Sequence, residues 1–252
     1  MPIKHAQPHA SVDAREVAKF AALADCWWDS KGPYRPLHRL NPVRLAFIRD
    51  RLCAHLDRDA RSLKPLKGLS IADIGCGGGL LTEPLARMGA AVTGIDAAEE
   101  NVAAAKAHAE ETGVTIDYRA TTAEALVAEG ASFDAVVSME VVEHVADRDG
   151  FLADCVALTR PGGGLFLATL NRTAKSYAMA IVGAEYILRW LPRGTHDWKR
   201  FVRPSELAAS LRNAGADVKA LAGVGYNPVS DTWGLEKSVD VNYMAFAVRR
   251  ED

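Results

Sequence analysis

The sequence predicts an α/β fold built on a doubly wound, Rossmann-like sheet of seven strands that is mostly parallel. Short apolar segments alternate with helical patterns through most of the chain, as they do in parallel sheets whose faces are covered by helices. A glycine-rich turn directly follows the first apolar segment, which is typical of the first βα unit of such folds. The chain has 252 residues, 49% of them hydrophobic and 25% charged, so one large domain with additions is expected.

The strand and turn at 69–79 organise the rest of the chain. The segment reads Leu-Ser-Ile-Ala-Asp-Ile-Gly-Cys-Gly-Gly-Gly, with glycines at 75, 77 and 79. Glycine is needed where the backbone takes a positive φ or must lie against a ligand without a Cβ atom in the way. We therefore expect a strand that ends near Asp73, a turn in which Gly75 and Gly77 bind a cofactor, and the start of a helix.

A carboxylate follows the second strand and indicates an adenosine. The strand at 91–96 ends in Asp96, 21 residues after Gly75, where an acidic side chain can accept both hydroxyl hydrogens of a ribose. A dinucleotide fingerprint would need glycine at the position of Leu80, although a NAD-binding fold remains an alternative on this motif alone. The pattern Asp-x-Gly-x-Gly-x-Gly, which begins at Asp73, resembles the first motif of the class I S-adenosylmethionine (SAM)-dependent methyltransferases. In that family Asp96 would match the ribose-binding acid.

Composition narrows the function classes. Thirty basic and 32 acidic residues give a net charge of −2, which does not indicate a nucleic-acid partner. Four cysteines, at 26, 53, 76 and 155, show neither a C-x-x-C pair nor metal-ligand spacing, as expected for a reducing compartment. The N-terminus has no apolar signal core, and Asp13 and Glu16 argue against a transit peptide. No uncharged apolar run reaches 18 residues, so no membrane span is expected.

Residues 1–68 are predicted to form a helical extension that contributes to the cofactor and substrate site, with the methyltransferase domain at 69–252. Apolar residues at helical spacing predict an amphipathic helix from Val12 to Trp28. The pair Trp27-Trp28 either fixes this helix to the main domain or places one indole in the wall of an apolar substrate pocket. Asn41-Pro42 predicts the start of a second helix, after a loop at 31–38.

Arg44 lies in the first turn of that second predicted helix. It is either a solvated or salt-bridged charge, or the cation that pairs with the carboxylate of SAM. The spacing alone leaves both interpretations open.

The remaining elements complete the sheet. Helices are predicted at about 98–111, from Thr122, at 148–159 and at 204–214, and strands at 114–119, 133–139, 165–170, 216–222 and 241–248. Met139, at the end of the fourth strand, would place a polarisable side chain near the adenosine. The turn Pro161-Gly162-Gly163 before the fifth strand is a second methyltransferase-like feature. The methyltransferase resemblance also implies an antiparallel last strand, which dehydrogenases lack.

Glu140, Glu143 and His144 follow the fourth strand and are the candidate catalytic residues. On a helix, positions i, i+3 and i+4 share one face, so two carboxylates and an imidazole would converge. His144 could act as a general base, since an ordinary imidazole pKa near 6.5 suits neutral pH. The three side chains could instead bind a divalent ion, Mg²⁺ or Zn²⁺. A Glu-His pair that only shapes the site is the third interpretation.

Residues 171–203 form an insertion between the fifth strand and the next helix. The segment is apolar and aromatic, and its seven basic and two acidic residues give it a local charge of +5. This composition predicts either a lid over the site or contact with an anionic membrane surface, and the two are compatible. The chain is therefore expected in the cytoplasm, peripherally on the inner membrane. His196 in this insertion is the alternative base to His144.

Blocks outside the general motifs resemble the ubiquinone-biosynthesis O-methyltransferases from about residue 12 to 248. They comprise Trp27-Trp28-Asp29, Pro36-Leu37-His38-Arg39, Asn41-Pro42-x-Arg44, Glu140 to His144, Leu170-Asn171-Arg172, Lys175-Ser176, 183–189, Gly194-Thr195-His196-Asp197, Tyr226-Asn227-Pro228 and Val239 to Met244. The resemblance implies SAM bound by Arg44, Gly75, Asp96 and Met139, and methylation of a phenolic hydroxyl on a polyprenyl catechol and on demethylubiquinol. It also implies a divalent ion at Glu140, Glu143 and His144 and other enzymes of the pathway as partners. A non-catalytic scaffold that binds the cofactor and recruits partners to a membrane is the alternative function.

Overall fold

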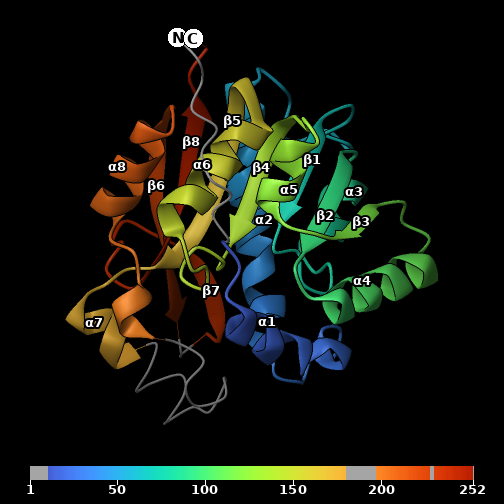
Figure 1. The fold of residues 1–252 in the computed structure, drawn as a ribbon, viewed down its shortest axis with the longest axis horizontal. Coiled ribbons are helices and arrows are strands. Elements are labelled where there is room, and N and C mark those ends of the chain that lie inside the picture. The colour runs from blue at the N-terminus through green and yellow to red at the C-terminus, as the bar shows by residue number, and fades with distance from the viewer. Residues whose placement is uncertain (1–10, 180–196, 228–229, 252) are drawn as a thin grey trace.

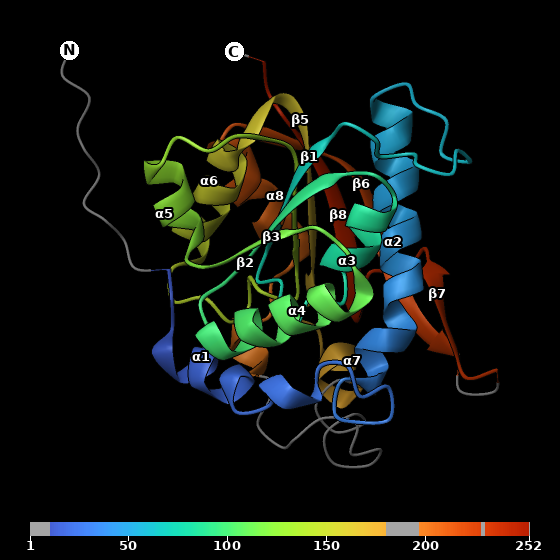
Figure 2. The ribbon, with the colours of Figure 1, turned by 90° about the vertical axis from the view of Figure 1, so that its right-hand side faces the viewer.

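The computed structural model describes residues 11–179, 197–227 and 230–251. They form one eight-stranded sheet in the order β3-β2-β1-β4-β5-β8-β6-β7 with helices on both faces (Figures 1 and 2). The strands are β1 (Ser70–Ile74), β2 (Ala91–Asp96), β3 (Asp117–Ala120), β4 (Phe133–Met139), β5 (Thr159–Leu170), β6 (Ala216–Asn227), β7 (Thr232–Glu236) and β8 (Asn242–Arg249). The doubly wound α/β architecture predicted from the sequence is confirmed.

The direction of the strands changes at one side of the sheet. Strands β1 to β5 pair in parallel, whereas β8 is antiparallel to both β5 and β6, as the methyltransferase resemblance implied. The sheet has one strand more than the seven predicted. Strand β6 continues to Asn227 and turns back into β7, which pairs with it from Thr232 to Glu236. The glycines at 223, 225 and 234 hid this hairpin, since glycine weakens a strand pattern in a sequence.

The helices are α1 (Ala14–Ala21), α2 (Arg35–His55), α3 (Thr82–Arg87), α4 (Glu99–Thr112), α5 (Ala123–Ala128), α6 (Arg148–Leu158), α7 (Ala174–Ser176) and α8 (Pro204–Asn213), with short 3₁₀ turns at Ala24–Cys26 and Trp198–Arg200. Helices α2 and α3 pack on one face of the central strands, and α5, α6 and α8 pack on the other (Figure 2). Helix α1 runs across the carboxyl ends of the parallel strands, at the bottom of Figure 1. The N-terminal extension therefore covers the edge at which doubly wound folds bind their ligands.

The two N-terminal helices differ from the prediction. The amphipathic pattern from Val12 to Trp28 is interrupted, because α1 ends at Ala21 and only a 3₁₀ turn follows. The N-cap predicted at Asn41 is wrong, since α2 begins six residues earlier, at Arg35. Pro36 lies at the start of this helix, where its missing N–H costs nothing, and Pro42 lies inside it. Pro33 and Pro36 made the first turn of α2 look like a loop, and Pro42 made the helix appear to start later.

Helix α2 joins the N-terminal extension to the core. Phe47, Ile48 and Leu52 are at most 2% exposed and pack with sheet residues that include Phe166. Burial of large apolar side chains of this kind stabilises a fold by about 1.5–3 kcal/mol each. The extension is thus held by the same core as the sheet.

The insertion at 171–203 is described only at its two ends. Residues 180–196, and with them the predicted second base His196, lie outside the described residues. In the described part of the chain, no helix has the length and apolar character needed to span a membrane.

Candidate active site

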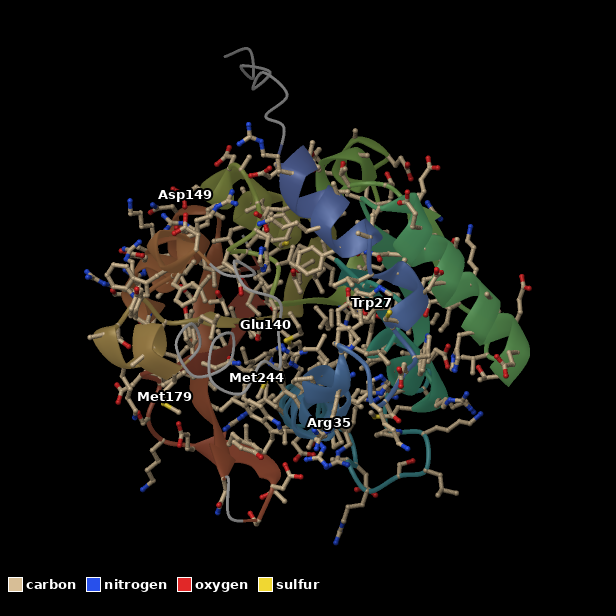
Figure 3. All side chains as sticks on the ribbon, turned by 90° about the horizontal axis from the view of Figure 1, so that it is seen from below. Trp27, Arg35, Glu140, Asp149, Met179 and Met244 are labelled. Carbon is tan, nitrogen blue, oxygen red and sulfur yellow. The ribbon has the colours of Figure 1, made fainter. Side chains whose placement is uncertain are left out.

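A cavity of about 490 Å³ lies at the carboxyl edge of the parallel strands. Its wall is formed by residues that follow successive strands: Gly75 after β1, Asp96 at the end of β2, Thr121 after β3 and Met139 at the end of β4. Residues of α1, α2, β6 and β7 complete the wall. Seen from below this edge, Glu140 and Trp27 lie toward the middle of the molecule, and Met179 lies at its rim (Figure 3). Most of the predicted site residues line this cavity.

The glycine loop adopts the predicted conformation. Gly75, Gly77 and Gly79 have φ values of 76°, 53° and 88°, all in the left-handed region that favours glycine. A Cβ atom on Gly75 would lie 2.4 Å from a methyl group of Val141, so no side chain fits there. Gly75 and Gly77 both line the cavity. The loop can therefore bring its backbone against a ligand.

Asp96 fixes the glycine loop through a hydrogen bond and also lines the cavity. Its carboxylate accepts hydrogen bonds from the N–H of Gly77 at 3.0 Å, the N–H of Ala98 at 2.9 Å and the Asn101 amide at 3.2 Å. Burial raises the pKa of Asp96, and these hydrogen bonds oppose that shift. A carboxylate fixed by three donors is preorganised to accept further hydrogen bonds from a ribose.

Asp73 lies behind the glycine loop and does not line the cavity. The hydroxyl of Thr82 donates a hydrogen bond of 2.6 Å to the carboxylate of Asp73. Asp73 is only 2% exposed. Burial raises the pKa of Asp73 to about 6. Asp73 joins the end of β1 to the first residue of α3, so it shapes the loop from beneath.

Replacing Asp73 with asparagine is expected to stabilise the protein at neutral pH. Because the folded-state pKa of about 6 exceeds the ordinary value of 3.8, the stability that Asp73 contributes is present at low pH and is lost as the pH rises through 6. The gain from Asp73→Asn should therefore grow between pH 4.5 and 7.5, to about 2–3 kcal/mol at most. Urea unfolding at both pH values measures it, with the exposed Asp59→Asn as control. A gain that does not change with pH would contradict the raised pKa.

Arg44 projects from the middle of α2 into the cavity wall. The residue is 5% exposed, and its guanidinium forms an ion pair of 2.9 Å with Glu140. The salt bridge that the sequence left open for Arg44 is thus present. The guanidinium nevertheless stays within the wall that also contains Gly75 and Met139, so its predicted contact with the SAM carboxylate remains a prediction.

The prediction that residues 140–144 form one helical face is wrong. Glu140 directly follows β4 with φ 59°, and the residues up to His144 form a turn rather than a helix. The three side chains do not share one face. Glu140 contacts Arg44, and the neighbouring Glu143 accepts a hydrogen bond of 2.9 Å from Thr169, whereas the imidazole of His144 faces the N-terminal extension. The left-handed residue at the strand end breaks the helical spacing on which the prediction depended.

Glu143 is 3% exposed, and its Oε1 has no hydrogen-bond partner in the described structure. Burial and the neighbouring Glu140 raise the pKa of Glu143 well above its ordinary value. No group of three or more His, Cys, Asp or Glu side chains in the described ranges is placed to hold a metal ion. The three-ligand set predicted at Glu140, Glu143 and His144 therefore does not fit a cation as these side chains lie.

His144 is paired with a residue that the sequence reasoning did not select. Its Nδ1 lies 2.8 Å from a carboxylate oxygen of Glu16, on α1, and Phe20 of the same helix packs edge-on against the imidazole at 5.1 Å. Hydrogen bonds from Lys19 and His144 outweigh burial and hold the pKa of Glu16 below its ordinary value. Arg200, which also contacts Asp13, lies 3.7 Å from Glu16. The turn after β4 and the N-terminal helix together form this pair.

The two tryptophans differ in their contacts, and the predicted place of an indole in a substrate pocket stays a prediction. Trp28 fixes the extension, because its indole N–H donates to the carbonyl of Gly78 at 2.8 Å and its ring stacks on His108 at 3.3 Å. Trp27 packs on the glycine loop and also lines the cavity, where it stacks on Tyr34. Sequence spacing contained no signal for Glu16 or Tyr34, since each reaches the cavity only through the tertiary fold.

The site fits an adenosine with a charged methionine tail. Asp96 offers acceptors for the ribose, the glycine loop offers a close backbone, and the buried Arg44 offers a cation in the same wall. Apolar side chains make up most of the remaining wall, as expected for ligand cavities. A carboxylate, a cation and a cradle without Cβ atoms are the groups that SAM requires.

Comparisons with known proteins agree with this fold. A family model described as a methyltransferase domain matches residues 72–167. The plantazolicin methyltransferase BpumL in complex with S-adenosylhomocysteine (SAH) has a TM-score of 0.62 at 15% identity, covering 94% of this chain and 97% of its own. The magnesium protoporphyrin IX methyltransferase ChlM from Synechocystis, with bound SAM, has a TM-score of 0.57 at 17% identity, covering 96% of this chain and 100% of its own.

Curated relatives are much more similar in sequence. The ubiquinone biosynthesis O-methyltransferase of Parvibaculum lavamentivorans is 56% identical over 243 residues, covering 96% of each chain. Its counterpart in Paramagnetospirillum magneticum is 55% identical and covers 99% of this chain and 100% of its own. The mitochondrial enzyme of Arabidopsis thaliana is 54% identical, covering 96% of this chain and 76% of its own. These relationships confirm the predicted fold class, SAM as the cofactor and methyl transfer as the activity. The chain belongs to the ubiquinone biosynthesis O-methyltransferase family.

Proposed function

We propose that this chain methylates a phenolic hydroxyl of a ubiquinone precursor, with His144 as the general base and Glu16 as the group that orients it. The acceptors we infer are a polyprenyl catechol and demethylubiquinol. The observation that carries the proposal is the His144–Glu16 pair in the wall of the cavity that also contains Gly75 and Asp96. An acceptor in this cavity would meet the base and the cofactor together.

Removal of the phenolic proton is the main chemical task of the protein. A phenol with a pKa near 10 is ionised in only about one molecule in a thousand at pH 7. We infer that Nδ1 of His144 carries the hydrogen shared with Glu16 and that Nε2 takes the acceptor proton. When bound, SAM would supply an electrophilic methyl group for the phenolic oxygen and would leave as SAH. The proton remains on the imidazole, where the carboxylate of Glu16 stabilises the positive charge.

The apolar part of the cavity wall suits an isoprenoid quinol. Val17 and Phe20 of α1, Leu37 and Leu40 of α2, and Trp233 of β7 line it with apolar surface. Burial of the acceptor ring against such side chains is favourable and removes water from the reacting oxygen. We infer that Glu140, through its ion pair with Arg44, and Glu143 position the turn that carries His144. The N-terminal extension, residues 1–68, thus contributes half of the proposed acceptor site.

We further propose that the insertion brings the enzyme to an anionic membrane surface, on the cytoplasmic side of the inner membrane, where the polyprenyl acceptor is dissolved. Tyr177 and Met179, at one described end of the insertion, are each 49% exposed, and Lys175 lies beside them with a side chain that is 54% exposed. Exposed apolar groups beside a cation are typical of interfacial contacts. Sedimentation with vesicles of anionic and of neutral lipids measures this contact, and equal binding to both would contradict it. We also propose that the enzyme contacts other enzymes of the pathway at this membrane surface.

Methyl transfer from labelled SAM to short-chain forms of both acceptors tests the proposed function. We expect transfer to both, with a much slower reaction for a phenol that lacks the second hydroxyl group. Parallel reactions with EDTA, and with Mg²⁺ or Zn²⁺ added back, test the divalent ion that the family resemblance implied. Transfer that persists in EDTA supports His144 as an unaided base, whereas transfer restored only by a metal would overturn that role. No transfer despite tight SAM binding would favour the scaffold function.

A further inference from the structure

Tyr34 lines the cavity and carries a buried hydroxyl group without a partner in the described structure. The residue precedes α2, is 4% exposed and lines the cavity together with Asp96 and Gly77. Its hydroxyl oxygen has no hydrogen-bond partner in the described structure. A polar group left unsatisfied in a protein interior costs about 1–3 kcal/mol, so native structures rarely retain one without a function.

The ring of Tyr34 is held firmly in place. It stacks on Trp27 with the ring centres 3.8 Å apart and the planes within 3° of parallel. Trp27 in turn packs on the glycine loop, where a Cβ atom on Gly77 would lie 2.4 Å from its ring, and its indole N–H donates to Asn101 at 2.9 Å. Asn101 itself donates to Asp96 at 3.2 Å. A continuous set of contacts therefore ties the position of Tyr34 to the ribose-binding carboxylate.

The hydroxyl of Tyr34 remains protonated and can only gain a partner from outside. Burial, with smaller effects of Cys26 and Asp96, raises its pKa far above the ordinary value of 10.0, so the group is a hydrogen-bond donor at neutral pH. No hydrogen bond joins this hydroxyl to the nearby carboxylate of Asp96, which accepts hydrogen bonds from Gly77, Ala98 and Asn101. A molecule bound in the cavity that Tyr34 lines would supply the missing acceptor.

We propose that Tyr34 is a cofactor-binding residue whose hydroxyl donates a hydrogen bond to an oxygen of SAM, on its ribose or on its carboxylate. Both groups are acceptors, and both belong to the one ligand that Asp96, the glycine loop and Arg44 fit. The stacked pair of Trp27 and Tyr34 then forms the outer wall of the cofactor site, and the N-terminal extension closes over the cofactor as well as over the acceptor. The inference rests on SAM as the cofactor and not on the identity of the acceptor.

The variant Tyr34→Phe tests this inference, because it removes the hydroxyl and keeps the stacked ring. We expect the dissociation constant for SAH, measured by titration calorimetry, to rise about 5- to 30-fold, as for loss of one hydrogen bond to a buried or charged acceptor. The ligand-free variant should unfold at the wild-type temperature or slightly above it, since the hydroxyl has no partner to lose. Only the increase in unfolding temperature that SAH causes should shrink.

Tyr118→Phe is the matched control. Tyr118 is also 4% exposed, but its ring lies behind the glycine loop against Gly94 and does not line the cavity. Its variant should bind SAH as the wild type does.

Titration with 5′-methylthioadenosine, which lacks the carboxylate, identifies the acceptor. A loss that persists with this ligand assigns the bond to the ribose, and a loss that disappears assigns it to the carboxylate. If Tyr34→Phe bound SAH with the affinity of the wild type, the inference would be overturned. It would also be overturned if the substitution lowered the unfolding temperature of the ligand-free protein as much as that of the SAH complex. Absence of SAH binding by the wild type would instead count against the cofactor itself.

Discussion

Asp96→Ala is expected to weaken SAM binding at least a hundredfold. The carboxylate can accept both ribose hydroxyl hydrogens, and hydrogen bonds to a charged acceptor contribute about 1.5–3 kcal/mol each. The same substitution removes the acceptor that fixes the N–H of Gly77 at 3.0 Å, so the glycine loop loses preorganisation as well. Titration calorimetry with SAM and SAH measures the loss.

A ligand without the ribose hydroxyls separates the two effects of this substitution. For a 2′,3′-dideoxy analogue of SAH, the difference between wild type and Asp96→Ala should shrink to the part caused by the loop. The exposed Asp117→Ala, on the neighbouring strand, should bind both ligands as the wild type does. An equal loss for SAH and its dideoxy analogue would show that Asp96 acts only through the loop.

His144→Ala is expected to lower kcat at least tenfold and to leave SAM binding near the wild-type value. General base catalysis typically contributes about 10²–10⁴-fold. The described contacts of His144 are with Glu16 and Phe20 of the N-terminal helix and not with Asp96 or the glycine loop. The deficit should narrow as the pH rises toward 10, because the phenol then ionises without help. Steady-state kinetics across this pH range, together with SAH titrations, measure both expectations.

Two further variants make the test of His144 specific. Glu16→Gln keeps an acceptor for Nδ1 but removes the charge, so it should lower kcat less than His144→Ala does and leave the affinity for SAM unchanged. The exposed His55→Ala, at the far end of α2, should retain wild-type kinetics. A His144→Ala enzyme with near-wild-type turnover would remove this residue from the mechanism.

Much of the sheet and of the cofactor site was predictable from local sequence. Strand β4 has the predicted bounds, Thr122 caps α5, and the glycines of the loop have the positive φ values that their spacing indicated. Each of these features depends on a short segment whose own residues determine its conformation. Asp96 belongs to the same class, since the end of β2 fixes its position at the edge of the sheet.

The acceptor side was less predictable because it depends on contacts between distant segments. The helical face expected for Glu140, Glu143 and His144 does not form, since the chain takes a left-handed turn at Glu140. The partner of His144 comes from 128 residues earlier in the chain, and no spacing rule connects it with Glu16. Tyr34 was missed for the same reason: its hydroxyl matters only because α2 begins next to the cofactor cavity.

The most direct measurement is the identity of the methylated atom. SAM with a ¹³C-labelled methyl group is incubated with the enzyme and a short-chain demethylubiquinol, and the product is examined by ¹³C NMR and mass spectrometry. We expect a single labelled carbon, attached to a phenolic oxygen, in the product of the wild type. His144→Ala should form much less of this product. A labelled methyl group on ring carbon, or label that stays on SAM while the acceptor is unchanged, would contradict this expectation.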